Sequence, residues 1–235
     1  MTDDQYLDIP KEYRKELIPV RQEQVLLSSH IILDSDLSLE DITLVAGLDV
    51  AYLKGDELAC AGLVVVDFRT LEVVEEHVEY FRPRIPYIPS FLHYRESPGY
   101  HTVIKRLKVE PELFLFDGNG IIHPQGIGLA SQMGLEIKQP TVGIAKKLLF
   151  GEYTPPLKKG GYSQIIHEEK NIGVAFQSAD LPAKPVYLSQ GHMIGFNTMI
   201  YVMREFIRNQ IFDTKLPVPL LLADRFVREK LGEKE

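Results

Sequence analysis

The stretch TLVAGLDVAYLKGDELACAGLVVVDF (residues 43–68) contains two apolar runs separated by the turn sequence KGD at residues 54–56. Apolar runs joined by a short turn that contains Gly and Asp are typical of a β-hairpin. A third run, LEVVEEHVEYF (71–81), follows a tight connection at residues 69–70 and mixes valines with glutamates, so we expect it to be half exposed. Consecutive strands with such short connections pair side by side, and the stretch predicts three antiparallel strands.

Downstream of these strands, strand-like runs alternate with helical segments. We expect a helix at 91–107 that is irregular at residues 97–99, a strand at 112–117, a helix at 127–137 and a strand at 141–145. A strand–helix–strand unit with buried apolar strands favours parallel pairing. Three antiparallel strands followed by parallel strands predict an α/β fold with a ribonuclease H-like mixed sheet and helices on both faces.

The two ends of the chain are expected to be helical. Residues 10–30 have the apolar spacing of a helix interrupted near Pro19, and PVPLLLADRFVREK near the C-terminus predicts a terminal helix that starts at a proline. Short strands are expected at 162–167, 171–177 and 185–189, before a helix at 193–209. We see no internal repeat or linker and expect a single domain over residues 1–235.

Composition narrows the classes of function. The 235 residues carry a formal net charge of -7, which disfavours binding of a polyanion by bulk electrostatics but leaves room for an acidic metal site. The single cysteine, Cys60, lies in an apolar run and is expected to be a buried thiol. The N-terminus has no apolar core and no run is long enough to span a bilayer, so we expect a cytoplasmic protein without membrane association.

Two aspartates are the first candidates for chemistry. Asp49 lies inside an apolar strand, where an unpaired carboxylate is costly to bury, so it is either a core hydrogen-bond acceptor or a metal ligand. Asp117 ends a strand and precedes Gly118 and Gly120, which suits either an ordinary Asp-Gly turn or a site at the carboxyl end of the sheet. The strands that carry the two aspartates are expected to be neighbours. Two close carboxylates repel each other unless a divalent cation such as Mg²⁺ or Mn²⁺ lies between them.

Three further residues could complete a hydrolytic site. Glu96 could add a carboxylate from a facing helix or be a surface glutamate, and His123 could meet a phosphate or be a structural loop histidine. Lys146 follows a strand and could neutralise a phosphate, although its neighbour Lys147 also fits a solvated basic pair. Together these residues suggest metal-assisted hydrolysis of phosphodiesters.

The segment LFLFDGNGIIHP (113–124) contains DGNG, which also occurs in calcium loops. Placing Gly120 at the loop position that requires glycine puts Leu115 and Gly126 where carboxylate ligands are needed. An EF-hand is therefore excluded.

Several motifs occur in an order that resembles the endonuclease V family. They are GLDVAY (47–52), PYIPSFLHYRE (86–96), FDGNGIIHP (116–124), GLASQMG (128–134), PTVGIAKKLL (140–149) and SQGH (189–192). The resemblance runs from about residue 10 to the C-terminus. It implies a metal-dependent DNA repair nuclease that recognises deaminated bases, hypoxanthine above all, and nicks the second phosphodiester bond on the 3′ side. It also leaves open the cleavage of inosine-containing RNA.

The resemblance assigns roles to individual residues. Asp49, Glu96 and Asp117 match the acidic metal-binding set, and Asp224 falls where the family has Asp or His near the metal. His123 and Lys146 match catalytic positions. The substrate-binding positions are an aromatic wedge at Tyr87, pocket loops at Gly118, Gly120 and Ile144, and a short loop beside the site at Gly191 and His192. We expect Mg²⁺ as the cofactor, with Mn²⁺ as a substitute, and a monomer.

The chain also departs from the family pattern. Gln125 replaces the arginine of HPR, Gly126 replaces a second basic residue, and Leu221 stands in a segment that usually reads PEPTRLA. Ser90 follows PYIP where glycine is frequent, and Gln190 replaces the proline of SPGH. The lost basic groups bear on affinity and substrate preference, because each phosphate contact contributes to binding.

Three functions compete on this basis. The first is a DNA repair endonuclease, the second is a ribonuclease that acts mainly on inosine-containing RNA, and the third is a non-catalytic nucleic-acid binding module of the same fold. The intact carboxylates argue against the third.

Overall fold

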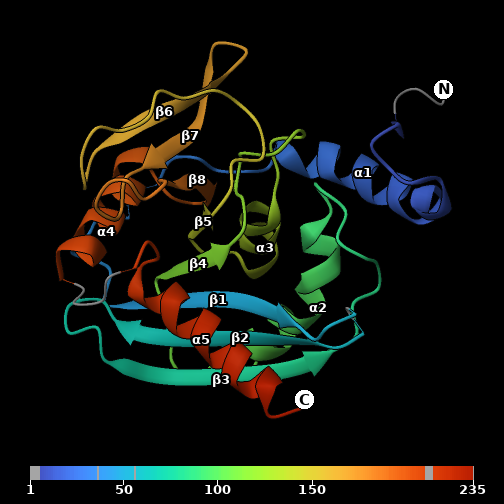
Figure 1. Cartoon of the computed structure of the whole chain (residues 1–235), viewed down its shortest axis with the longest axis horizontal. Coiled ribbons are helices and arrows are strands. Elements are labelled where there is room, and N and C mark those ends of the chain that lie inside the picture. Colours follow the sequence, from blue (N-terminus) through green and yellow to red (C-terminus); the bar gives the residue numbers. More distant parts are fainter. Residues whose placement is uncertain (1–5, 36, 56, 210–213, 235) are drawn as a thin grey trace.

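The computed structural model describes residues 6–35, 37–55, 57–209 and 214–234. Its centre is one eight-stranded sheet with the strand order β3-β2-β1-β4-β5-β8-β7-β6 (Figure 1). The strands are β1 (Leu44–Tyr52), β2 (Ala59–Asp67), β3 (Val73–Phe81), β4 (Leu113–Asp117), β5 (Thr141–Ala145), β6 (Tyr162–His167), β7 (Lys170–Phe176) and β8 (Val186–His192).

Strand pairing confirms the predicted mixed sheet. β1 pairs antiparallel with β2, and β2 pairs antiparallel with β3. β1, β4 and β5 are parallel, as the strand–helix–strand pattern predicts. The additional strands extend the sheet: β8 pairs antiparallel with β5, β7 with β8, and β6 with β7.

Helices cover both faces of this sheet, as predicted (Figure 1). One apolar cluster joins the sheet to α4 and α5, and a second cluster joins its other face to α2 and α3. The helices are η2 (Lys11–Tyr13), α1 (Arg14–Ser28), α2 (Leu92–Ile104), α3 (Leu129–Ile137), α4 (Phe196–Asn209) and α5 (Val218–Gly232).

The two predicted helix irregularities at prolines are wrong. α1 continues through Pro19 and α2 continues through Pro98. Each proline removes one helical N–H and leaves the carbonyl four residues earlier without its usual partner. At Pro19 both the ring and Lys15 are exposed, so water can bond to that carbonyl and the helix can continue.

The connections that build the antiparallel strands follow the turn chemistry of the sequence. Gly55 has a φ of +99° between β1 and β2, while residue 56 of the predicted turn lies outside the described residues. Between β2 and β3, Asp67 Oδ1 accepts hydrogen bonds from the backbone N–H groups of Arg69 and Thr70. Cys60 is buried and β3 is half exposed, as predicted. No helix in the described part of the chain combines the length and apolar character needed to cross a membrane.

Candidate active site

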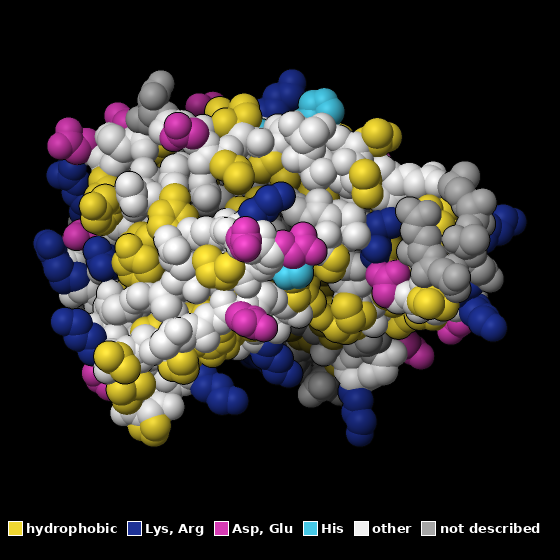
Figure 2. All heavy atoms as spheres, turned by 90° about the horizontal axis from the view of Figure 1, so that it is seen from above, with side chains coloured by type: hydrophobic (Ala, Val, Ile, Leu, Met, Phe, Trp, Pro, Cys, Tyr) yellow, Lys and Arg dark blue, Asp and Glu magenta, His cyan; other side chains and the backbone are white. Residues whose placement is uncertain are grey.

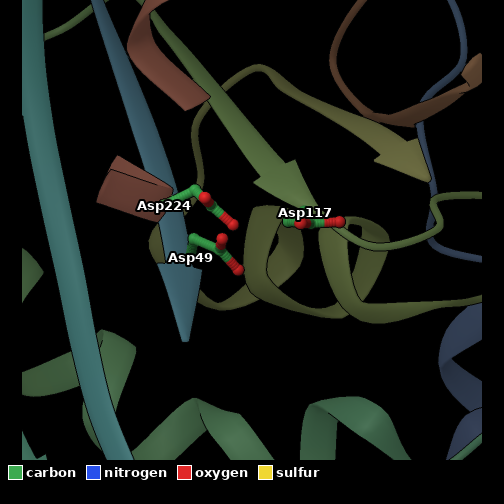
Figure 3. A group of neighbouring side chains, drawn as sticks. All are labelled: Asp49, Asp117 and Asp224. Atoms are coloured by element: carbon green, nitrogen blue, oxygen red, sulfur yellow. The ribbon is translucent and has the colours of Figure 1, made fainter. Parts of the chain in front are cut away.

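Three aspartates from distant segments converge at the carboxyl end of the central parallel strands. Asp49 lies in β1, Asp117 ends β4 and Asp224 lies in α5. Leu48 pairs with Phe116, so the parallel register puts Asp49 and Asp117 next to each other on adjacent strands. One carboxylate oxygen from each of the three lies within 4.8 Å of the others. Asp49 and Asp224 lie side by side and point toward Asp117 (Figure 3).

Close packing of α5 on β1 brings Asp224 next to Asp49 and Asp117. A Cβ atom on Gly47 would lie 2.2 Å from the carbonyl carbon of Pro219, at the beginning of α5. Only glycine leaves room for this approach. The short distance between helix and strand therefore depends on Gly47.

The electrostatics of the three carboxylates are unequal. Burial raises the pKa of Asp49 well above its usual value, and the charge of Asp117 adds to the effect. Burial also raises the pKa of Asp117, although Lys146 opposes the rise. Burial likewise acts upward on Asp224, but its bonds to Arg228 and the charge of Lys146 outweigh it and hold its pKa at about 2. The site therefore concentrates negative charge that needs a positive partner.

Two positively charged side chains, those of Lys146 and Arg228, partly neutralise the three carboxylates. Lys146 Nζ lies 2.6 Å from Asp117 Oδ2 and 3.3 Å from Asp224 Oδ1. Arg228 donates to both oxygens of Asp224, each bond being 3.0 Å long. Sequence reasoning found Lys146 but missed Arg228. The available signal was the spacing of four residues between Asp224 and Arg228 on one helix, which puts their side chains together.

The donor set fits a small divalent cation. Carboxylate oxygens are the ligands that Mg²⁺ and Mn²⁺ prefer, and three of them are already grouped here. Two of the three aspartates have raised pKa values because their charges are buried together, and a bound cation would relieve that cost. Among the described residues, Asp49, Asp117 and Asp224 are the group of potential ligands that lies this close together.

Glu96 lies near this group but is not one of the three. It is 5% exposed on α2, where the hydroxyls of Tyr52 and Tyr100 donate to its two carboxylate oxygens over 2.6 and 3.2 Å. Burial raises its pKa to about 8, with Asp117 contributing repulsion. Sequence reasoning missed both tyrosines. Tyr100 could have been found from its position four residues after Glu96 on the same helix.

His123 has both ring nitrogens engaged away from the carboxylates. Its Nε2 lies 3.0 Å from the carbonyl oxygen of Ser90, and its Nδ1 accepts a hydrogen bond from the backbone N–H of Gln125. Burial lowers the pKa of His123 to about 4, so the ring is neutral at pH 7. This predicted catalytic residue thus connects the Asp117 loop to the segment that carries Tyr87, through its hydrogen bond to Ser90.

The loop after Asp117 crosses over β5 and borders a pocket. A Cβ atom on Gly143 would lie 2.3 Å from the backbone nitrogen of Gly120, so the crossing requires a glycine in β5. The pocket, of about 350 Å³ including its open mouth, is lined by Tyr87, Ser90, Leu92, His93, Asn119, His123, Gly128, Leu129, Gln132 and Leu149. Asn119 lines this pocket, and its amide oxygen is buried without a hydrogen-bond partner. A buried acceptor without a partner at the pocket wall is an unusual feature that a ligand could satisfy.

Three further predicted substrate-binding residues lie in strands rather than in loops. Ile144 is buried in the apolar cluster shared with α4, pairs with Asp117 in the parallel register, and accepts a hydrogen bond from Gly118 N at its carbonyl oxygen. Gly191 and His192 lie in β8 rather than in a loop. His192 pairs with Thr141, at the end of β5 remote from Lys146, and its Nδ1 accepts from the backbone N–H of Ile32. Ile144 therefore lies beside Asp117 and Gly191 beside Gly120, whereas His192 lies at the far end of β5.

The departures from the family pattern have defined places. Ser90 adopts a φ of +68°, a region that favours glycine. The side-chain amide of Gln190 donates to the carbonyl oxygens of Leu33 and Ile194. Leu221 is buried in the apolar cluster under α5, and Gly126 has a φ of +67°. These residues therefore support the loops and the core at their positions.

Comparisons with known proteins agree with this geometry. The sequence model of a family described as Endonuclease V matches residues 26–225. Endonuclease V of Thermofilum pendens is 36% identical over 214 residues, which cover 89% of each chain. The crystal structure of endonuclease V from Bacillus subtilis matches with a TM-score of 0.85 at 30% identity, covering 97% of this chain and 96% of that one. Endonuclease V of Ciona intestinalis, in complex with a 24mer DNA containing an inosine followed by a ribo-adenosine, matches with a TM-score of 0.83 at 26% identity, covering 94% of this chain and 100% of that one.

Proposed function

This chain belongs to the endonuclease V family and is an endonuclease, and from that premise we propose that it is a metal-dependent DNA repair enzyme for deaminated bases. Its main lesion would be hypoxanthine. The cut would fall at the second phosphodiester bond on the 3′ side, leaving a 3′-hydroxyl and a 5′-phosphate. The observation that carries the proposal is the convergence of Asp49, Asp117 and Asp224 within 4.8 Å.

The three aspartates would hold Mg²⁺, or Mn²⁺ in its place, and Glu96 would lie beside them. When bound, the cation supplies Lewis-acid stabilisation of the charge on the scissile phosphate. Arg228 fixes the orientation of Asp224 by its two hydrogen bonds, so that this carboxylate is in place before the cation arrives.

Lys146 would act on the substrate. In the structure its ammonium group contacts Asp117 and Asp224, and 45% of its side chain is exposed. A cation at the carboxylates would weaken the attraction that holds Lys146 there, and the long side chain can then turn to the phosphate. There it would neutralise charge that develops during cleavage.

Recognition of the lesion would use the pocket beside the Asp117 loop. A base can enter such a pocket only after it leaves the helical stack, and Tyr87, 61% exposed at the rim, is placed to fill the gap. The amide oxygen of Asn119 is buried at the pocket wall without a partner, and a small movement of this side chain would let it accept a hydrogen bond from N1–H of hypoxanthine. Adenine has no hydrogen at N1, so this contact would favour the deaminated base.

Bulk attraction of nucleic acid contributes little to this proposal. The net charge is -7, and on the face in Figure 2 acidic, basic and apolar side chains are interspersed without a continuous basic surface among the residues drawn in colour. Binding would rest on the cation, the pocket and the exposed tyrosine.

Cleavage of inosine-containing RNA is the second candidate. The nucleic acid in the Ciona intestinalis complex carries a ribo-adenosine after the inosine, so that relative accepts a ribonucleotide there. In this chain Gln125 and Leu221 stand where basic residues are frequent. Fewer basic residues make fewer phosphate contacts, which argues against high affinity for duplex DNA.

Matched oligonucleotides test the proposal. Single-stranded and duplex DNA, and RNA of the same sequence, each with one inosine, are incubated with the protein in Mg²⁺, in Mn²⁺ or in EDTA, and the product ends are mapped. We expect one cut at the second bond 3′ to inosine in the DNA, none in EDTA and none in DNA without inosine. A cut confined to RNA would favour the second candidate, and cutting unaffected by EDTA would contradict metal dependence.

A further inference from the structure

The segment 85–90 presents Tyr87 outward, while other residues of the segment hold it to the protein. Ile85 and Ile88 are buried in an apolar cluster with Ile9 and Leu17 from the N-terminal region, whereas Tyr87 is 61% exposed. The buried guanidinium of Arg95 donates to the carbonyl oxygen of Ile85 at the start of the segment. The first half of the segment is therefore fixed from α2.

The other end of the segment is fixed at Ser90 by three different side chains. Its carbonyl oxygen accepts from Gln24 Nε2 over 2.8 Å and from His123 Nε2 over 3.0 Å, and its hydroxyl accepts from Arg21 Nη2 over 2.7 Å. Ser90 itself is held at a φ of +68°, which a serine adopts only when its surroundings impose it. Three contacts on one strained residue leave it little freedom to move.

Arg21 and Gln24 are buried although they come from an N-terminal helix. Gln24 is 1% exposed and Arg21 is 7% exposed. The Arg21 guanidinium lies 4.7 Å from the centre of the Phe91 ring, and its Nη2 also bonds to Asp8. Both residues precede residue 26, where the match to the family begins. A long polar side chain is costly to bury, and the contacts that offset this cost converge on the end of the Tyr87 segment.

We propose that Arg21 and Gln24 of α1 are positioning residues that set the place of Tyr87 over the lesion pocket. The inference rests on the proposed function, because it assigns α1 to the same recognition step. His123 links Ser90 to the Asp117 loop, so the tyrosine, the pocket and α1 share one fixed point. Loosening Ser90 would let Tyr87 sample many positions and lower the fraction of encounters in which the base is displaced.

The test uses an inosine duplex with 2-aminopurine beside the inosine, whose fluorescence rises when the neighbouring base leaves the stack. Fluorescence is measured in Ca²⁺, in which we expect binding without appreciable cleavage, and single-turnover cleavage is measured in Mg²⁺. The variants are Arg21→Ala, Arg21→Lys, and Tyr87→Ala as the reference for loss of the wedge. Arg14→Ala is the matched control, because Arg14 lies on the same helix and bonds to Ile9 rather than to Ser90.

We expect Arg21→Ala to resemble Tyr87→Ala. The fluorescence rise should shrink and the half-saturating enzyme concentration should increase about tenfold, the usual effect of losing one charged hydrogen bond. The maximal cleavage rate should change less than threefold, because loss of a binding contact raises the half-saturating concentration and leaves the maximal rate nearly unchanged. Arg21→Lys should recover most of the signal. Arg14→Ala should match the wild type in both readouts.

Two results would overturn the inference. One is wild-type fluorescence and half-saturation in Arg21→Ala. The other is a fluorescence loss that follows only from unfolding, with an early melting transition in Arg21→Ala and no recovery in Arg21→Lys. Failure of the wild type to cut the inosine strand would contradict the proposed function itself and the inference with it, whereas wild-type cutting with an unaltered Arg21→Ala contradicts the inference alone.

Discussion

Lys146 illustrates how much a single side chain depends on what surrounds it. Burial by itself would lower its pKa, but Asp117, Asp49 and Asp224 raise it, so the ammonium group stays charged. Under the proposed function, the same charge would serve the carboxylates before a cation binds and the phosphate afterwards. Its role is therefore better tested in the chemical step than in substrate binding.

Lys146→Ala should slow the single-turnover rate more than it weakens binding of the intact strand. Loss of one electrostatic contact in an enclosed site removes about 2–4 kcal/mol of transition-state stabilisation. Because the Lys146 side chain is 45% exposed, we expect the lower value, roughly a 30-fold slower rate. Lys147→Ala is the matched control and should change neither quantity much. Weak binding with an unchanged single-turnover rate would instead make Lys146 a phosphate anchor.

The sequence identifies the site residues whose type or position is unusual. It does not identify all of the residues that form hydrogen bonds to them. Asp49 inside an apolar strand and Asp117 at a strand end were visible, because a charge in such places needs an explanation. Arg228 and Tyr100 lie four residues from their partners on one helix and look like ordinary surface or core residues, whereas the partner of Tyr52 is distant in sequence. The resemblance, rather than the residues themselves, led us to place Gly191 and His192 in a loop, whereas they extend β8.

At the scale of elements, α2 and α3 are joined by a carboxylate between two histidines. Glu136 on α3 lies 3.0 Å from His93 Nε2 and 2.9 Å from His101 Nε2, both on α2. Although burial acts upward, the two histidines lower the pKa of Glu136 to about 2. Since α2 carries Glu96 and α3 follows the Asp117 loop, this contact helps to hold both sides of the site together.

Glu136→Gln should lower the melting temperature at pH 7 by about 2–4 °C, as expected for about 1 kcal/mol from a contact between partly exposed polar side chains. The folded pKa lies below the unfolded one, so this stability is present above pH 4.5 and is lost as pH falls toward 2. The difference from wild type should therefore shrink as pH falls below 4.5 and be lost as pH falls through about 2. The exposed residue Glu110 supplies the control Glu110→Gln, and equal shifts in the two variants at pH 7 would mean that the contact contributes nothing.

The order of elements could be predicted because each strand and helix has its own pattern. The short connections predict antiparallel pairing of the first three strands. The helices between the later strands predict that those strands are parallel. The continuity of α1 and α2 could not be predicted, because it depends on whether solvent or packing compensates each proline. The packing of α5 against Gly47 likewise depends on an approach that no local pattern reveals.

For the whole molecule, burial of the carboxylates at the site lowers the free energy of unfolding. A cation bound under the proposed function would offset that loss. Burial raises the pKa of Glu96 to about 8 and also raises that of Asp49. For Glu96 the unfolded chain releases its proton near pH 4.5 while the folded chain keeps it until about pH 8. Between these values each increase in pH favours the unfolded state, so the metal-free protein should lose stability as pH rises through this window.

Thermal melting in EDTA and in Mg²⁺ tests this linkage. In EDTA the melting temperature should fall between pH 5.5 and pH 8.5 by roughly 5–10 °C, the effect of a few kcal/mol in a protein of this size. Mg²⁺ should raise it more at pH 8.5 than at pH 5.5, because cation and protons compete for the same carboxylates. A Mg²⁺ effect that is independent of pH would contradict the assignment of the buried carboxylates to the metal site.

The most direct test of the account is the Mg²⁺ dependence of cleavage by Asp117→Asn. The amide keeps the shape of the side chain and removes its charge, so a cation at Asp49, Asp117 and Asp224 would lose a main ligand. With an inosine-containing duplex we predict that this variant folds and binds the DNA but yields no nick at any Mg²⁺ concentration at which the wild type turns over. Wild-type turnover by Asp117→Asn at the same Mg²⁺ concentrations would contradict the account.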